Sequence, residues 1–178
     1  MPEIDTIHAD ALPLTYDSLV EQFSACGVSA GQTVLVHSSM SSMGWIVGGA
    51  VDVIRALLHV VGENGTLMMP THTSNNTEPS HWQKPPVPEH WWPIIRQRRP
   101  AYDPRITPSW GMGAIPEVFR TGPGAIRSEH PIGSFTAVGK NAAYVTRDHD
   151  LEREFGQPSP IGKLYELDGY ILLLGVPH

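Results

Sequence analysis

The chain has 178 residues, of which 40% are apolar, and this fits a single domain over residues 1–178 with a sizeable core. Its formal net charge of −6 argues against a nucleic-acid partner and suits a cationic one. No run approaches the roughly 20 apolar residues of a membrane span, the acidic start has no basic signal-peptide region, and the single cysteine, Cys26, excludes an internal disulfide. We therefore expect a soluble, cytoplasmic protein.

The first predicted element is a helix over residues 16–25. Thr15 is suited to cap its N-terminus, and Gly27 supplies a stop signal after its last turn. Cys26 directly precedes that stop, and we expect it to be a small packed residue at the helix end.

The central feature of the sequence is a predicted βαβ unit over residues 33–71. Residues 33–36 are a short β-branched, apolar run that is typical of a buried strand, and residues 66–69 are a second such run. Between them, residues 50–61 place apolar side chains at helical spacing, and Gly62 ends the helix. The pattern predicts an α/β fold.

A turn of hydroxyls and glycines joins the first of these strands to the helix. It leads from the carboxyl end of a strand into a helix N-terminus, where free N–H groups and the helix dipole favour an anion. The turn matches neither the dinucleotide fingerprint nor the P-loop signature, so a ligand site and a purely structural capping role are both open. Its residues are His37, Ser38, Ser39, Met40, Ser41, Ser42, Met43 and Gly44.

The composition of the sequence changes over residues 72–110, which contain eight prolines and four of the five tryptophans. A loop of this length inside a domain is usually functional or disordered, and disordered segments are poor in aromatic residues. We therefore expect an ordered excursion that forms a wall or lid of the site. A structural excursion that covers an edge of the sheet is the alternative.

After the excursion, the pattern of an α/β domain returns. The sequence predicts helices over residues 112–120, 141–148 and 159–167, a strand over residues 134–138, and a charged loop over residues 150–158. The apolar run YILLLG at residues 170–175 predicts a buried strand. Because a buried strand normally leads into another element, we expect the chain to be the N-terminal part of a longer protein.

Nine histidines raise the question of a metal, but no pair has the spacing of known ligand motifs, so no metal site is predicted. His37 opens the anion-friendly turn, where it could fix a loop carbonyl, donate to a bound carbonyl or act as a base. For His130, which Arg127 and Glu129 could orient, structural and functional roles are equally open. His149 lies in an acidic run and is expected to be solvated.

Acidic residues gather near the end of the chain and in the excursion. If both groups border one cleft, they would attract a polycationic substrate; otherwise the first group is a solvated loop. The two groups are Asp148, Asp150, Glu152 and Glu154, and Glu78 with Glu89.

Five collinear stretches together resemble the aminoglycoside 3-N-acetyltransferase family. The resemblance implies an α/β fold of that family's type, with a mixed sheet and helices on both faces, distinct from the GNAT fold. It also implies transfer of an acetyl group from acetyl-coenzyme A to the 3-amino group of an aminoglycoside antibiotic, which confers resistance. The stretches are VLVHSSMSSMGWIVGGA (34–50), GENGTLMMPTHT (62–73), YDPRITPSWGMGAIPEVFR (102–120), RSEHPIGSFTAVG (127–139) and GQPSPIGKLYELDGYILLLGV (156–176).

The resemblance further implies how the site is divided between the two substrates. The turn at residues 37–44 would receive the pyrophosphate and pantetheine arm of the coenzyme, with residues 107–112 on the same side. The wall after Thr71 and the loop at residues 148–156 would face the antibiotic. The residues expected to bind are His37, Ser38, Ser39, Met40, Ser41, Ser42, Met43, Gly44, Thr107 and Met112 for the coenzyme, and Glu78, Glu152 and Phe155 for the acceptor.

One departure from the family pattern concerns the general base. In the family a histidine in a motif L-H-x-A-E follows the strand that matches YILLLG, whereas this chain ends at His178, before such a motif. We therefore expect the principal base beyond residue 178, with direct transfer rather than an acyl-enzyme, since no activated serine is evident. An acyltransferase acting on another amine, and a coenzyme-binding fragment without turnover, remain open. The sequence does not indicate the antibiotic spectrum or the oligomeric state.

Overall fold

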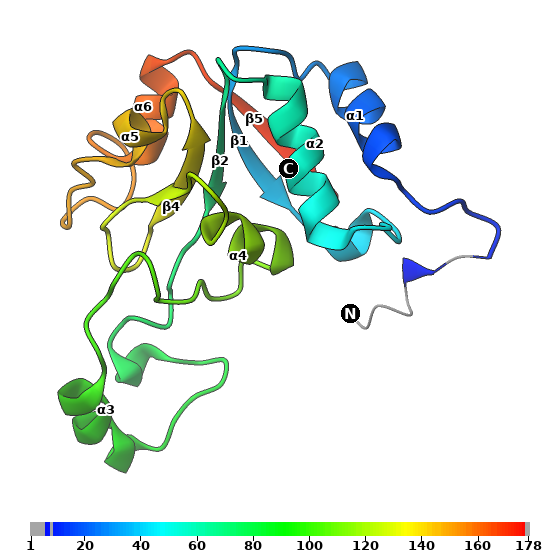
Figure 1. Cartoon of the computed structure of the whole chain (residues 1–178). Coiled ribbons are helices and arrows are strands. Elements are labelled where there is room, and N and C mark those ends of the chain that lie inside the picture. Colours follow the sequence, from blue (N-terminus) through cyan, green and yellow to red (C-terminus); the bar gives the residue numbers. More distant parts are fainter. Residues whose placement is uncertain (1–5, 8, 177–178) are drawn as a thin grey trace.

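The centre of the fold is a five-stranded mixed sheet with helices on both faces, as Figure 1 shows. The structure is a computed structural model that describes residues 6–7 and 9–176, so His178 lies outside the described residues. The strand order is β3-β4-β2-β1-β5; β1 runs parallel to β2 and β5, while β4 runs antiparallel to β2 and β3. This confirms the expected fold class. The strands are β1 (Thr33–Ser38), β2 (Thr66–Pro70), β3 (Ile126–Arg127), β4 (Phe135–Gly139) and β5 (Tyr170–Leu174).

The predicted βαβ unit is present and lies at the middle of the sheet. Strands β1 and β2 pair in parallel, with Leu35 opposite Met68, and α2 (Gly49–Val61) connects them. Gly62 caps this helix with a φ of 64°, a value that favours glycine. Strand β1 is two residues longer than expected, because its pairing with β5 continues through His37 and Ser38.

The remaining predicted helices form within two residues of their expected ends. Thr15 and Ser18 form a capping box at the start of α1, and the hydroxyl of Ser159 caps α6. The helices of the main body are α1 (Tyr16–Ala25), α2, α4 (Ala114–Arg120), α5 (Ala142–Thr146) and α6 (Pro160–Glu166), with a 3-10 turn at Met40–Ser42. None of the helices in the described part of the chain has the length and apolar character needed to cross a membrane.

The alternation of side chains along β1 divides the core between the two faces of the sheet. Val34 and Val36 pack with the apolar sides of α1, α2 and α4, and Leu35 packs with α5 and α6 on the opposite face. Each side chain of this kind contributes on the order of 1.5–3 kcal/mol when it is removed from water. The sheet is therefore packed against helices on both faces.

Two sequence predictions about burial are wrong. Strand β5 was expected to be buried, but Tyr170 and Ile171 are 54% and 61% exposed, because β5 is an edge strand whose described partner is β1 alone. Cys26 was expected to be packed, but it is exposed. After Cys26 the chain turns at Gly27, with a φ of 93°, and Val28 enters the core instead.

The excursion after β2 forms an ordered lobe of residues 74–110, which projects beyond the strand ends rather than along an outer strand (Figure 1). It contains 3-10 turns at Pro79–His81 and Glu89–Trp91, followed by α3 (Trp92–Arg98), which the sequence analysis did not predict. The last residue of the lobe returns to the segment before it, where the Trp110 amide donates to the carbonyl of His72, at 2.8 Å. The lobe is thus tied to the sheet next to His72 and Trp110, and this part is named its root.

Candidate functional site

The site forms where four strand ends meet at one edge of the sheet. Strands β1, β2 and β5 are parallel, so their carboxyl ends lie at this edge, and antiparallel β4 begins there, with Phe135 opposite Pro70. Ligands of open α/β sheets bind outside the carboxyl ends of such strands. The segments around residues 37–44, 71–73 and 128–135 are therefore brought together.

The predicted coenzyme turn, residues 37–44, is here named the serine loop. The amide of Ser39 donates to the carbonyl of Leu174 in β5, at 2.8 Å, so the loop is fixed to the sheet. The hydroxyl of Ser39 lies 3.3 Å from that of Ser41 and 3.0 Å from that of Ser42. The buried hydroxyl of Ser38 has no hydrogen-bond partner among the described residues. The loop therefore holds a cluster of hydroxyls with unused bonding capacity.

A cavity of about 380 Å³ lies between the serine loop and the start of α4. It is lined by residues 38–41 on one side and residues 111–116 on the other, so the structure brings Met112 to the predicted loop. Thr107 does not line this cavity; its hydroxyl accepts a hydrogen bond from the Asp103 amide, and its carbonyl accepts one from Arg127. Residues 41–44 line a second groove, of about 590 Å³, opposite residues 11–14.

The N-terminus of α2 already holds an acidic side chain. The carboxylate of Asp52 lies over Gly48, where an added Cβ would come within 2.2 Å of it. An acid in the first turn of a helix is stabilised by the helix dipole. The anion-favouring end of α2 is thus satisfied internally, and the serine loop faces open space toward residues 111–116 instead.

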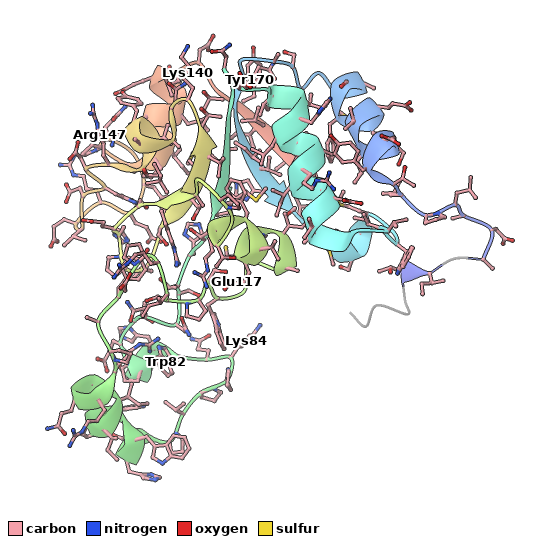
Figure 2. The ribbon with its side chains drawn as sticks, viewed as in Figure 1. Trp82, Lys84, Glu117, Lys140, Arg147 and Tyr170 are labelled. Carbon is pink, nitrogen blue, oxygen red and sulfur yellow. The ribbon has the colours of Figure 1, made fainter. Side chains whose placement is uncertain are left out.

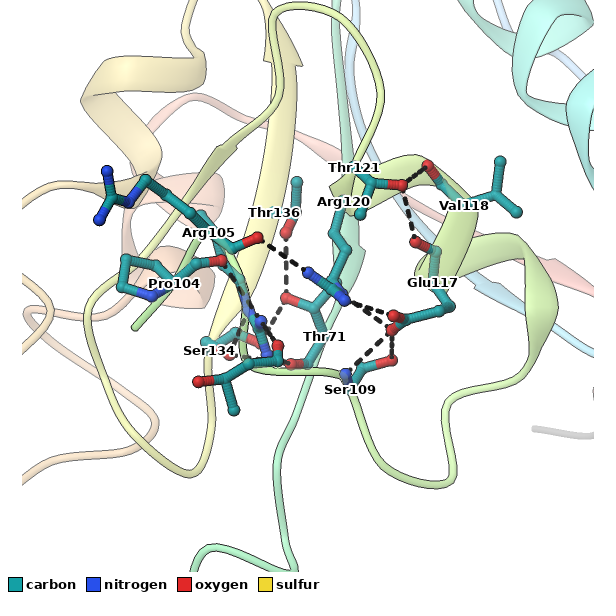
Figure 3. Close-up of polar contacts among 12 residues, drawn as sticks. Thr71, Pro104, Arg105, Ser109, Glu117, Val118, Arg120, Thr121, Ser134 and Thr136 are labelled. Atoms are coloured by element: carbon teal, nitrogen blue, oxygen red, sulfur yellow. Dashed lines mark hydrogen bonds and ion pairs between the residues drawn. The ribbon is translucent and has the colours of Figure 1, made fainter. Parts of the chain in front are cut away.

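Arg127 is buried at the root of the lobe and joins three segments, and Figure 3 labels its partners Thr71 and Ser134. Its guanidinium donates to the carbonyls of Thr71 and Thr107, and its Nε donates to the hydroxyl of Ser134, at 3.0 Å. The hydroxyl of Ser134 donates in turn to the carbonyl of Thr71, at 2.9 Å. Arg127 was suggested as a partner for His130, but it clamps the ends of β2 and the lobe against the start of β4.

His130 and His149 form a buried pair whose ring centroids lie 4.7 Å apart. The Nε2 of His149 lies 2.9 Å from the carbonyl of Glu154, which can only accept, so Nε2 carries the proton and Nδ1 accepts from the Ser128 hydroxyl at 3.0 Å. The Nδ1 of His130 accepts from the amides of residues 132 and 133. These bonds fix both rings in a neutral tautomer.

The expectation that His149 is solvated is wrong. Asp148 adopts a left-handed conformation, with a φ of 49°. The side chain of His149, which follows it, lies in the interior and forms hydrogen bonds with Ser128 and Glu154. Burial lowers the pKa of His149, and the nearby His130 lowers it further. The acidic composition of this run predicts exposure, although His149 within it is buried.

His72 lies between the serine loop and the histidine pair. Its ring contacts Phe135 and Phe155 edge-on, with centroids 5.0 and 6.0 Å away, and its buried Nδ1 has no hydrogen-bond partner among the described residues. Burial first, and then the neighbouring His37, His149, Arg127 and His130, lower the pKa of His72 to about 4. His72 was not predicted as a site residue, although it follows β2 closely and so parallels His37 at the end of β1.

The other predicted residues are dispersed. His37 is half-buried, and burial lowers its pKa, so it is neutral near pH 7. The carboxylate of Glu78 lies on the lobe and binds Arg96, whose hydrogen bonds lower the pKa of Glu78 to about 2. Glu152 is exposed in its loop, whereas Phe155, in the same loop, reaches His72. Within residues 6–7 and 9–176, no three His, Cys, Asp or Glu side chains are placed to hold a metal ion.

Comparison with known proteins shows close relatives across nearly the whole chain. The family model described as aminoglycoside 3-N-acetyltransferase matches residues 35–178. The SPbeta prophage-derived aminoglycoside N(3')-acetyltransferase-like protein YokD of Bacillus subtilis is 48% identical over 95% of this chain and 62% of its own length. Aminoglycoside N(3)-acetyltransferase VII of Streptomyces paromomycinus is 38% identical over 99% of this chain and 61% of its own. The chain thus spans about three fifths of the length of these relatives.

Solved structures show the same likeness. The crystal structure of YokD matches with a TM-score of 0.94 and 47% identity, over 97% of this chain and 64% of that one. AAC-IIIb in a binary complex with CoASH matches with a TM-score of 0.81 and 33% identity, over 93% and 61%. AAC-VIa bound to sisomicin matches with a TM-score of 0.79 and 31% identity, over 91% and 59%. With the mixed sheet, the serine loop and these matches in agreement, the chain belongs to the aminoglycoside 3-N-acetyltransferase family.

Proposed function

We propose that the protein takes part in acetyl transfer from acetyl-coenzyme A to the 3-amino group of an aminoglycoside antibiotic, as a cytoplasmic resistance enzyme. The observation that carries this proposal is the cavity between residues 38–41 and residues 111–116 at the carboxyl edge of the sheet. A relative with the same fold was solved with CoASH, and another with sisomicin. Family membership and the site geometry support the same reaction class.

The cavity suits the phosphate-bearing arm of the coenzyme. Ser38, Ser39 and Ser41 line it, and the hydroxyl of Ser38 is buried without a partner, so a ligand oxygen would satisfy a group that the protein leaves unpaired. Gly111 and Gly113 have φ values of 73° and 87°, and the missing side chains leave the backbone open to close approach by a ligand. We assign residues 37–44, with Met112, to the coenzyme.

The histidines on the other side of the site suit a polycationic acceptor. His72 and His149 have lowered pKa values and remain uncharged near pH 7, so they do not repel ammonium groups. The loop at residues 148–156 has acidic side chains at the surface, among them Glu152, and the lobe carries Glu78. We assign these segments to the acceptor.

In the reaction, the amine nitrogen bonds to the acetyl carbonyl carbon, the carbon–sulfur bond breaks, the amine gives up a proton, and the sulfur leaves as a thiolate that takes up a proton. The coenzyme supplies the acetyl group as an activated thioester. His37 has a lowered pKa, so it is a weak base and serves better as a hydrogen-bond donor that orients the acetyl group. We expect the principal base outside residues 1–178, as the family resemblance implies.

The coenzyme assignment is tested with two matched charge insertions. Ala114→Glu places a carboxylate at the cavity, where it would repel the phosphates of the coenzyme, while Ala143→Glu places one on an exposed position of α5. Calorimetric titration with coenzyme A should show a dissociation constant at least about tenfold higher for A114E and unchanged for A143E. Equal affinity of A114E and the parent protein would remove this cavity as the coenzyme site.

The acceptor assignment is tested by acetylation assays with gentamicin and with a simple diamine, with thiol release from acetyl-coenzyme A as the signal. Turnover with gentamicin alone supports the proposed reaction. Turnover with the diamine alone would assign another amine to the same fold. Coenzyme binding without either turnover would identify a coenzyme-binding fragment that lacks the base. In the same assay, His37→Ala should lower turnover or coenzyme affinity by tenfold or more, and a smaller loss would reduce His37 to a structural residue.

A further inference from the structure

Among the described residues, three buried side-chain polar atoms lack a hydrogen-bond partner, and two of them, the hydroxyl of Ser38 and the Nδ1 of His72, belong to the sheet edge described above. Buried polar groups are almost always paired, so an unpaired one at a candidate site needs an explanation. Ser38 lines the coenzyme cavity, whereas His72 does not. The imidazole of His72 is therefore a separate unsatisfied group.

Phe155 covers one side of this imidazole. Its ring centroid lies 6.0 Å from that of His72 and 6.5 Å from that of Phe135, which packs on the imidazole from the sheet. Phe135 is buried in β4, but Phe155 is 53% exposed. Of the two aromatic neighbours of His72, only Phe155 borders solvent and has room to move.

The loop that carries Phe155 is anchored beside it rather than through it. The carbonyl of Glu154 accepts a hydrogen bond from His149, and that of Gly156 accepts one from the Ser159 amide, at 2.8 Å. Rotation of the Phe155 side chain about its own Cα–Cβ bond breaks neither bond. The ring can therefore uncover His72 while the loop backbone stays in place.

We propose that the Nδ1 of His72 accepts a hydrogen bond from an amino group of the acceptor, and that Phe155 covers this atom until the acceptor binds. The inference rests on the proposed aminoglycoside acceptor and identifies the side chain that selects for its amines. In this role the proton of the neutral imidazole is on Nε2, which leaves the lone pair of Nδ1 free to accept. His72 is a substrate-positioning residue, not a base.

The chemistry of a neutral imidazole suits this task better than a carboxylate would. A carboxylate would hold an amine in its protonated form, which cannot attack a thioester, whereas an uncharged acceptor binds the amine and still allows it to lose a proton. The low pKa of His72 supports this role, since the ring stays neutral beside a cationic ligand. Phe155, once displaced, would remain at the rim of the site.

The direct test follows the ring nitrogens of His72 by ¹⁵N NMR of the histidine-labelled chain, with His72→Asn used to assign the signal. Gentamicin alone should shift the Nδ1 resonance to lower frequency, as expected when its lone pair accepts a hydrogen bond, and coenzyme A alone should leave it in place. Calorimetry on the same samples reports binding independently. Gentamicin that binds without moving this resonance overturns the inference and leaves the proposed function intact, whereas gentamicin that does not bind overturns both.

Two substitutions at His72 separate hydrogen bonding from packing. Asn keeps a polar atom near the position of Nδ1, and Leu keeps similar volume without one. Loss of a hydrogen bond to a charged group predicts a dissociation constant for gentamicin about tenfold or more higher in H72L, and within about threefold of the parent in H72N, with coenzyme A affinity unchanged in both. Equal weakening in H72N and H72L, with unchanged thermal unfolding, would leave His72 with a packing role only.

The cover is tested by the rate of binding. Phe155→Ala should raise the association rate constant for gentamicin several-fold, because the acceptor no longer has to displace the ring. Tyr165→Ala, at an 85% exposed position of α6 outside the segments assigned to either substrate, is the matched control and should leave the rate unchanged. An association rate for F155A that equals that of the parent would exclude Phe155 as a cover.

Discussion

The lobe of residues 74–110 is held at its root and in its outer part by arginines in very different surroundings. At the root, Arg127 is 7% exposed and binds carbonyl oxygens of segments far apart in the sequence. In the outer part, the side chain of Arg96 is 50% exposed and pairs with Glu78 of the same lobe. Figure 2 shows Trp82 and Lys84 on the lobe, between α3 and Glu117 of the main body.

This difference shows where the lobe is coupled to the sheet. The loss of a buried hydrogen bond costs stability because it leaves buried polar groups unpaired. An exposed ion pair contributes little to stability, because water solvates the separated charges well. The outer contacts link the lobe to itself, as when Arg99 lies 5.2 Å over the ring of Trp82. The root therefore couples the lobe to the sheet edge, whereas the outer contacts hold segments of the lobe to one another.

The largest expected effect is at the root. Arg127→Met removes the guanidinium and leaves the carbonyls of Thr71 and Thr107 without it, which should lower the free energy of unfolding by about 3 kcal/mol or more. Arg96→Met makes the same chemical change in the outer lobe and should leave the denaturation midpoint nearly unchanged. Urea unfolding followed by circular dichroism measures both. Similar midpoints for the two variants would contradict the distinction between root and outer lobe.

A second prediction uses pH to probe His72, at the edge where the root begins. Its pKa is about 4 in the folded protein and 6.5 in the unfolded chain, so between these values the unfolded chain binds more protons. Stability should therefore fall as the pH is lowered from 6.5 to 4, by on the order of 2 kcal/mol for this group after allowance for partial exposure.

Unfolding titrations at pH 7, 6, 5 and 4 test this. His72→Asn should show a shallower loss of stability than the parent protein across that window. His90→Asn, at an exposed position of the lobe, should follow the parent. A parent protein and H72N that lose stability in parallel would show that burial does not keep His72 neutral in this pH range.

A matched pair of hydroxyls gives a smaller effect. Ser134 at the root accepts from Arg127 and donates to Thr71, and Thr77 in the lobe accepts from Trp82 and donates to Ser74. Ser134→Ala should cost about 1–2 kcal/mol, because buried partners lose their bonds, and Thr77→Val about 0.5 kcal/mol. Chemical denaturation resolves this difference, and a reversed order would contradict it.

The smallest effect is expected for the exposed ion pair. Glu78→Gln removes its charge and should leave the unfolding midpoint of the whole protein unchanged, while limited proteolysis within the lobe becomes faster. High salt should abolish the difference in proteolysis between the variant and the parent. A shift of the global midpoint would instead place the outer lobe within the cooperative core.

Much of the main body could be predicted because its signals are local. The βαβ unit, the cap at Ser159 and the serine loop each depend on residues that are close in sequence. Helix α3 had a local signal too, Pro93 in its first turn, but its seven residues were too few to show periodicity among so many prolines.

The other half of the site depends on contacts that no local pattern reveals. Arg127 binds residues 20 and 56 positions away, and His149 binds Ser128 from 21 positions away. An acidic run predicts exposure, yet a single left-handed residue turned His149 inward. In the same way, the apolar composition of β5 predicts burial, whereas its exposure follows from its place at the edge of the sheet.

The exposed Cys26 has a practical consequence, since it is the only cysteine of the chain and lies at the C-cap of α1. Maleimide reagents would modify this one thiol, so a spin label could be attached at a defined place without any mutation. Helices α1 and α3 lie at opposite ends of the molecule in Figure 1. A second cysteine at the exposed Ile94 in α3 would then let pulsed electron resonance measure the spread of separations between lobe and sheet, with and without an antibiotic.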